Sequence, residues 1–293
     1  MAIASRTSFI GVGWKDWYQV AGGESAYLAF DPENPSVVYG TQIQGLITRY
    51  DVPNKRDKPI QVYPEKALGM IPKDMKYRFN WNPPLVWRPQ NPNIMYFGAQ
   101  KLLRTSDGGL SWEEISPDLT RNQLERQGPG GGPFTNEAAG GENYNTIMYI
   151  VPSPHQQGII YVGTDDGLVH LTMDEGQNWK DITPDGLPEA IINCIEISPH
   201  DPSIAYMVAM RYKFGDFTPL IYKTTDYGTS WSLISEGIAD DTFVRAVRED
   251  PETKGLLYAA TEKGFYISNN QGDNWHRLDL NLPPVPITDI TIK

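Results

Sequence analysis

Four acidic side chains stand in predicted loops, where a carboxyl group could take part in catalysis: Glu24, Glu142, Asp165 and Asp166. Glycoside hydrolysis usually needs two carboxyl groups that face each other across the scissile bond, about 5 to 9.5 Å apart. The adjacent Asp165 and Asp166 could also share a proton or bind calcium, the one cofactor that the sequence suggests. The competing interpretation is structural, because an aspartate before a glycine, here Gly167, is a common turn residue.

Aromatic and arginine side chains form a second group of candidates. Residues 74–81 (Asp-Met-Lys-Tyr-Arg-Phe-Asn-Trp) place an arginine among three aromatic rings. Such a cluster suits the face of a sugar or the carboxylate of a peptide, although core packing alone would also explain it. The residues expected to contact a ligand are Tyr77, Arg78, Trp81, Tyr144, Arg245 and Trp14.

The longest predicted loop runs from residue 120 to residue 145 and contains the run Gly128-Pro-Gly-Gly-Gly-Pro133. Loops longer than about 12 to 15 residues without secondary structure tend to be functional or disordered. Two interpretations stay open, a lid that contacts a ligand and a mobile connection. Glu142 and Tyr144 belong to this loop.

The composition argues against several classes of function. The 293 residues carry a formal net charge of −11 with no basic stripe, which disfavours nucleic-acid binding. No apolar run approaches the roughly 18 to 20 residues of a membrane-spanning helix, and the first residues lack the features of an export signal. Cys194, the single cysteine, lies in an alternating run that predicts a buried thiol. The four histidines are too widely spaced to predict a metal site.

A first repeated signature is a turn followed by a short apolar strand that ends in tyrosine. It occurs five times, at intervals of 45 to 65 residues. The tyrosines are Tyr39, Tyr96, Tyr161, Tyr206 and Tyr258. A repeat of this length is typical of stacked units that share one continuous core.

A second signature, Ser/Thr-x-Asp-x-Gly-x-x-Trp, occurs in phase with the first. In such a turn the aspartate can accept hydrogen bonds from backbone N–H groups, the glycine supplies an unusual backbone angle, and the tryptophan covers the hairpin. A structural role is therefore expected for these residues, and the fourth copy agrees because an asparagine can still cap the turn. The residues are Asp107, Trp112, Asp174, Trp179, Asp226, Trp231, Asn270 and Trp275.

Short strands punctuated by Gly, Pro and Asp at this period predict an all-β fold, a β-propeller of four-stranded antiparallel blades. Five complete blades are expected in one domain over residues 1–293. Their approximate ranges are 26–64, 83–119, 145–187, 192–238 and 244–281. Residues 1–20 are expected to form outer strands of a preceding blade, and residues 287–293 the first strand of a following one. Either these ends pair and close a small ring, or the chain belongs to a longer propeller.

The second signature resembles the Asp-box of the bacterial-neuraminidase repeat superfamily, which includes sialidases, xyloglucanases, photosystem assembly factors and sortilin-type receptors. Residues 77–84, 115–122, 163–170 and 243–250 are similar to large secreted bacterial proteins labelled glycosyl hydrolase or sortilin-like repeat proteins. The likeness spans nearly the whole chain, which resembles the middle portion of those proteins. The resemblance implies a periplasmic or secreted location.

Three functions are compatible with this resemblance. The leading expectation is a non-catalytic propeller that binds a protein, peptide or glycan at its channel mouth. The alternatives are a glycoside hydrolase that acts on a polysaccharide through paired carboxylates, and a structural subunit of a larger complex or of a larger propeller. Sialidase activity is not expected, because Arg78 and Arg245 would supply only part of the arginine triad that it needs.

Overall fold

The computed structural model describes residues 2–3, 13–24, 27–31, 34–65, 69–128, 143–278, 281 and 283–292. In these ranges the chain is built from β-strands and 3-10 turns, with no α-helix. The strands form five four-stranded sheets and one two-stranded sheet, and all the strand pairs are antiparallel. The predicted all-β propeller fold is therefore confirmed.

Each four-stranded sheet is a meander of consecutive strands, and we call each one a blade. Blade one contains β3 (Leu28–Asp31), β4 (Asn34–Thr41), β5 (Ile47–Asp51) and β6 (Arg56–Pro59). Blade two contains β7 (Leu85–Arg88), β8 (Asn91–Gly98), β9 (Leu102–Thr105) and β10 (Glu113–Glu114). Blade three contains β11 (Ile147–Pro152), β12 (Ile160–Thr164), β13 (Val169–Thr172) and β14 (Lys180–Asp181).

Blades four and five follow the same order. Blade four contains β15 (Ile191–Ile197), β16 (Ala205–Met210), β17 (Leu220–Thr224) and β18 (Ser232–Leu233). Blade five contains β19 (Val244–Glu249), β20 (Leu257–Thr261), β21 (Gly264–Ser268) and β22 (His276–Arg277). The 3-10 turns are η1 (Trp14–Asp16), η2 (Ile43–Gly45), η3 (Pro72–Asp74), η4 (Leu124–Arg126) and η5 (Tyr212–Phe214).

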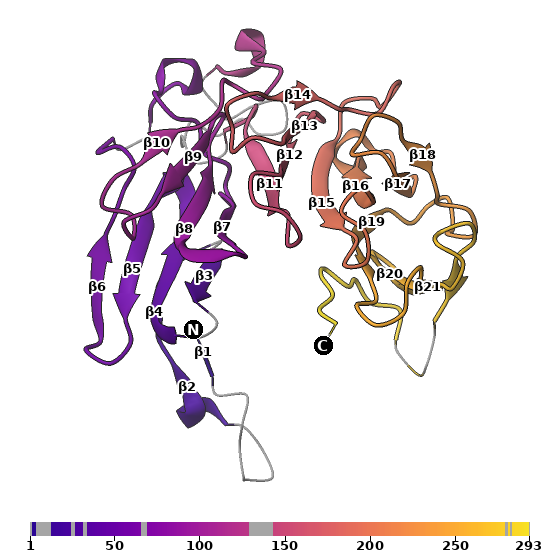
Figure 1. Ribbon diagram of the computed structural model, residues 1–293, viewed down its shortest axis with the longest axis horizontal. Helices are drawn as coiled ribbons and strands as arrows, with labels where there is room; N and C mark the ends of the chain where they lie inside the picture. The colour runs from indigo at the N-terminus through magenta and orange to yellow at the C-terminus, as the bar shows by residue number, and fades with distance from the viewer. Residues whose placement is uncertain are drawn as a thin grey trace.

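The blades stand side by side along an open arc, with blade one at one end and blade five at the other (Figure 1). The first strands contact one another in succession, from β3 to β7, β11, β15 and β19, so they line the inside of the arc. Strand β16 is buried at every position, because the neighbouring blades cover both faces of its sheet. Cys194 of β15 is buried in the same core, as its alternating run predicts.

The Asp-box turn of blade two shows how the outer edge of a blade is held. Asp107 Oδ1 accepts hydrogen bonds from the backbone N–H groups of Leu110 and Ser111, both at 2.9 Å. The Ser111 hydroxyl donates to Oδ2 at 2.6 Å, and these bonds lower the pKa of Asp107 to about 2. In the fourth copy, the Asn270 Oδ1 accepts from the N–H of Asn274 at 3.1 Å.

The tryptophan of each Asp-box reaches the preceding blade. Its indole N–H donates to a backbone carbonyl that follows the fourth strand of that blade. The four bonds are Trp112 to Ile60 at 3.2 Å, Trp179 to Ile115 at 2.8 Å, Trp231 to Ile182 at 2.6 Å and Trp275 to Ile234 at 2.6 Å. Every pair of consecutive blades is therefore linked in the same way.

The glycine of the Asp-box is required by the same contact. Gly176 has a φ of +92°, and a Cβ built there would lie 2.4 Å from the carbonyl oxygen of Ile115. A side chain at this position would push the turn away from the preceding blade, in addition to straining the backbone.

The two ends of the arc differ from each other. Near the N-terminus, β1 (Ala2–Ile3) pairs with β2 (Trp17–Tyr18) in the two-stranded sheet. The strand expected over residues 287–293 is not formed, and residues 287–292 follow an irregular path. The N–H of Ile287 bonds to the carbonyl of Thr261 at 3.0 Å. Ile287 and Ile290 pack against the core of blades four and five.

We expect Trp275→Ala to lower the free energy of unfolding by roughly 3 to 5 kcal/mol, because it leaves a cavity and an unpaired carbonyl between blades four and five. The Trp275 side chain is 1% exposed. Trp14→Ala is the control, since that ring is 86% exposed and its loss should cost less than about 0.5 kcal/mol. Urea denaturation followed by circular dichroism measures both values, and equal losses would contradict this role of the Asp-box tryptophan.

Candidate functional site

A cavity of about 640 Å³ is lined by strands and connections of blades two, three, four and five. Six separate parts of the chain contribute to its wall: residues 80–82, 143–148, 165, 191–193, 210–213 and 245. Propellers commonly assemble a site from short loops in this way. The lining residues are Asn80, Trp81, Asn82, Asn143, Tyr144, Met148, Asp165, Ile191, Asn193, Met210, Tyr212, Lys213 and Arg245. We call this cavity the channel mouth.

Asp165 is the carboxyl group of this lining. It follows β12 and is held in place by Thr146, whose N–H and hydroxyl lie 2.8 and 2.7 Å from its two oxygens. The amide of Asn80 lies 3.3 Å from Oδ2. Burial, together with the neighbouring Asp166, raises the pKa of Asp165 to about 8. Burial and the neighbouring Asp166 thus favour the protonated form of this carboxyl group, and the hydrogen bonds from Thr146 oppose the shift.

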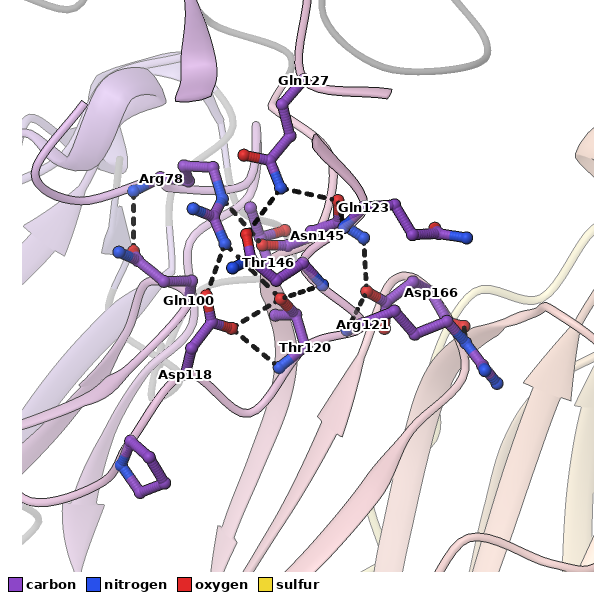
Figure 2. A network of polar contacts seen from close by, with 12 residues as sticks. Arg78, Gln100, Asp118, Thr120, Arg121, Gln123, Gln127, Asn145, Thr146 and Asp166 are labelled. Carbon is purple, nitrogen blue, oxygen red and sulfur yellow. Dashed lines mark hydrogen bonds and ion pairs between the residues drawn. The ribbon is translucent and has the colours of Figure 1, made fainter. Parts of the chain in front are cut away.

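Asp166 has a different role, although it is the next residue. Its Oδ2 accepts from the backbone N–H of Arg121 at 2.9 Å and from the Asn145 amide at 2.6 Å, and its Oδ1 accepts from the Thr164 hydroxyl at 2.5 Å. Figure 2 shows Asp166 at one side of a polar network, where it bonds to Arg121 and Asn145. The carboxylate thus ties residues 120–127 to blade three and does not line the channel mouth.

Arg78 belongs to the same network and is 5% exposed. Its Nη2 donates to Asp118 Oδ2 at 2.8 Å, its Nε to the Asn145 carbonyl at 3.3 Å, and its backbone N–H to Gln100 Oε1 at 2.8 Å (Figure 2). The Arg78 guanidinium thus links the connection that precedes blade two to the segment that follows blade two. Tyr77 is also buried, and its hydroxyl donates to Glu114 at 2.9 Å.

The remaining predicted residues divide into two groups. Trp81, Tyr144 and Arg245 line the channel mouth together with Asp165. Tyr144 donates to Glu189, and burial with this bond raises the pKa of its phenol above the usual value. Trp14 and Glu24 are exposed and lie outside the lining, and Glu142 lies outside the described residues.

Several lining residues were not anticipated, among them Asn143, Tyr212 and Lys213. Asn143 is 4% exposed, and among the described residues its Oδ1 has no hydrogen-bond partner. Tyr212 and Lys213 lie in η5, in the connection between β16 and β17. That connection contains no glycine-rich run, but it places three aromatic side chains within six residues, which is the signal that could have identified it.

In the described part of the chain, no group of three or more His, Cys, Asp or Glu side chains is arranged to hold a metal ion. No described helix is long and apolar enough to span a membrane.

The raised pKa of Asp165 predicts a pH dependence of stability. The folded state holds the proton of the Asp165 carboxyl group more tightly than the unfolded state does. The contribution of this group to the free energy of unfolding is therefore complete at low pH and is lost as the pH rises from about 3.8 to about 8. The free energy of unfolding should therefore fall over this interval more steeply for the wild type than for Asp165→Asn. Urea denaturation at several pH values measures the difference, and parallel curves would show that Asp165 ionises normally.

No family model and no curated protein matches the chain. Among solved structures, the GH74 xyloglucanase from Xanthomonas campestris is similar, with 19% identity and a TM-score of 0.55 over 86% of this chain. The GH74 enzyme of Niastella koreensis gives 19% identity and a TM-score of 0.57 over 86% of this chain. YCF48 bound to D1 peptide gives 16% identity and a TM-score of 0.54 over 88% of this chain.

The matches span 38% of the length of each of these two GH74 chains and 68% of the YCF48 chain, and 25% of an ancestral GH74 enzyme. These similarities are too low in sequence identity to transfer an activity, and they establish the fold. In fold, this chain is similar to the propellers of the GH74 enzymes and of YCF48, in agreement with the repeat resemblance seen in the sequence.

Proposed function

We propose that this propeller binds a ligand at its channel mouth, as a binding module outside the cytoplasm. The observation that carries the proposal is the cavity of about 640 Å³, to which six parts of the chain contribute side chains of complementary chemistry. Trp81, Tyr144 and Tyr212 provide aromatic surface, Lys213 and Arg245 are cations, and the asparagines offer amide groups. Ligand sites combine aromatic or apolar surface with convergent polar groups, and here seven of the thirteen lining residues are polar or charged.

The number of carboxyl groups in the cavity supports binding without catalysis. A glycosidase needs two of them across one bond, and among the described lining residues Asp165 is the single carboxyl group. Asp166, its neighbour, is occupied by Arg121, Asn145 and Thr164. A protein, peptide or glycan ligand would therefore be held by stacking and hydrogen bonds. The structural neighbour YCF48 was solved with a bound peptide, which supports a peptide as one such ligand.

Trp81→Ala tests this proposal. Loss of an aromatic wall of the site should weaken binding at least about tenfold, since aromatic side chains at the centre of an interface carry much of its energy. Candidate ligands come from glycan and peptide arrays, and calorimetry then measures their dissociation constants. Trp14→Ala removes an equal ring away from the cavity and should leave binding unchanged. If both variants bound every ligand like the wild type, the channel mouth would not be the binding site.

A glycoside hydrolase is the second candidate, favoured by the raised pKa of the Asp165 carboxyl group, since a general acid needs a shift in this direction. We expect in that case that the protein releases reducing sugar from a polysaccharide and that Asp165→Asn lowers the rate by about a hundredfold or more. Asp185→Asn, at an exposed position outside the cavity, is the matched control. Glu142→Gln tests the second carboxyl group that the sequence suggests. Hydrolysis that neither Asp165→Asn nor Glu142→Gln affects would exclude this mechanism.

A further inference from the structure

The charged side chains that line the channel mouth are already engaged. Nε and Nη2 of Arg245 both donate to Glu262 Oε2, at 2.8 and 2.6 Å. Lys213 also has an interaction of its own. Asp165 accepts from the N–H and the hydroxyl of Thr146, and burial favours its neutral form. A charged group of a ligand would therefore find no unpaired charge of opposite sign among these three side chains, and burying it there would be costly.

Several neutral polar groups of the lining, in contrast, have no hydrogen-bond partner among the described residues. Within these ranges the Asn82 side chain makes no hydrogen bond, and only its backbone N–H is used. Asn193 donates its amide N–H to the Arg245 carbonyl at 2.6 Å, and no described group donates to its Oδ1. The Tyr212 ring stacks on Phe243, while its hydroxyl is not bonded to any described residue. The available groups thus include donors and acceptors, all of them uncharged.

Aromatic surface lies next to these groups. Trp81, the residue before Asn82, is half-buried in the wall of the same cavity. Tyr212 of η5 contributes a second ring. Amides and a hydroxyl beside an aromatic ring complement a sugar, which has an apolar ring face and hydroxyl groups that both donate and accept. The volume of about 640 Å³ lies within the range of about 300 to 1,000 Å³ that is usual for small-molecule sites.

We propose that the channel mouth binds an oligosaccharide that carries no charged groups. A sugar ring would lie against Trp81, and its hydroxyl groups would bond to the Asn82 amide, to Asn193 Oδ1 and to the Tyr212 hydroxyl. This inference rests on the proposed binding function and names its ligand class. A peptide with an acidic or basic side chain is disfavoured, because its charge would be buried without a partner.

The test compares oligosaccharides of equal length that differ in charge. Hexamers of glucose, xylose and mannose are neutral, whereas hexamers of galacturonic acid carry carboxylates and hexamers of glucosamine carry amines. Isothermal titration calorimetry measures their dissociation constants for the full chain. We expect at least one neutral hexamer to bind at least about tenfold more tightly than both charged hexamers. Equal or tighter binding of a charged hexamer, binding confined to peptides, or no binding of a neutral hexamer would overturn the inference.

Two conservative variants locate the hydroxyl contacts. Tyr212→Phe keeps the ring on Phe243 and removes only the hydroxyl, and Asn82→Leu replaces the amide by an apolar group of similar shape. Each should weaken the neutral hexamer about fivefold, since each removes one or two neutral hydrogen bonds. Tyr18→Phe and Asn93→Leu are the matched controls, because both side chains are exposed and lie outside the lining. Unchanged binding by either cavity variant, or equal weakening by the controls, would contradict these contacts.

Asn82→Asp tests the charge selectivity itself. The substitution places a carboxylate where the amide stood, with almost the same shape. The glucosamine hexamer should therefore gain at least about tenfold in affinity relative to the glucose hexamer. A merely structural role of Asn82 would weaken all sugars alike, and that result would overturn the inference.

The inference and the proposed function can fail separately. If a charged sugar or a peptide binds and Trp81→Ala weakens that binding, the channel mouth remains the site and the neutral-sugar inference is wrong. If Trp81→Ala leaves the binding of every ligand unchanged, the proposed function itself is wrong.

Discussion

The fold depends on one contact that is repeated between every two consecutive blades. The Asp-box turn brings a tryptophan against the preceding blade, where its indole N–H bonds to a backbone carbonyl, as in Trp179 and Ile115 at 2.8 Å. Only glycine fits at the turn, because Gly176 touches that same carbonyl. A single blade cannot bury its second strand. Two neighbouring blades that are held together by these contacts bury both faces of that strand. The turn therefore acts as a spacer between sheets as well as the end of a hairpin.

This spacing at the outer edge leaves the connections on the inside free to differ. The connection before blade two and the segment after it are tied together by Arg78 and Asp166, both within one buried network. Burying such charged groups is costly unless they are paired, and here they are, whereas the Oε1 atoms of Gln123 and Gln127 have no partner among the described residues. Its effect is to fix the positions of Asn80 and Trp81 relative to Asp165 in the wall of the cavity.

The sequence was sufficient to predict the propeller, because each Asp-box has a local chemistry that can be recognised without knowledge of the rest of the chain. It was partly sufficient for the candidate site. Trp81, Tyr144, Asp165 and Arg245 do meet at one cavity, but Arg78 lies in the network behind it. Neighbouring residues on an irregular connection can point in opposite directions, and no periodicity in the sequence decides which one faces the channel. Tyr212 was missed for a related reason, since the ring on which it stacks, Phe243, comes from the connection that leads into the next blade.

The Asp-box turn and the connections at the channel mouth use their polar atoms differently. In the Asp-box, the oxygens of Asp107 accept the hydrogen bonds that the turn offers, and the turn is complete without a ligand. At the channel mouth, the Asn143 amide donates to the Phe79 carbonyl at 3.1 Å and so links the connections before blades two and three. Its buried Oδ1 has no donor among the described residues, but Tyr161 and Glu249 carry such atoms away from the cavity, so this feature belongs to the fold as a whole. What distinguishes the channel mouth is that side chains from four blades converge on one cavity.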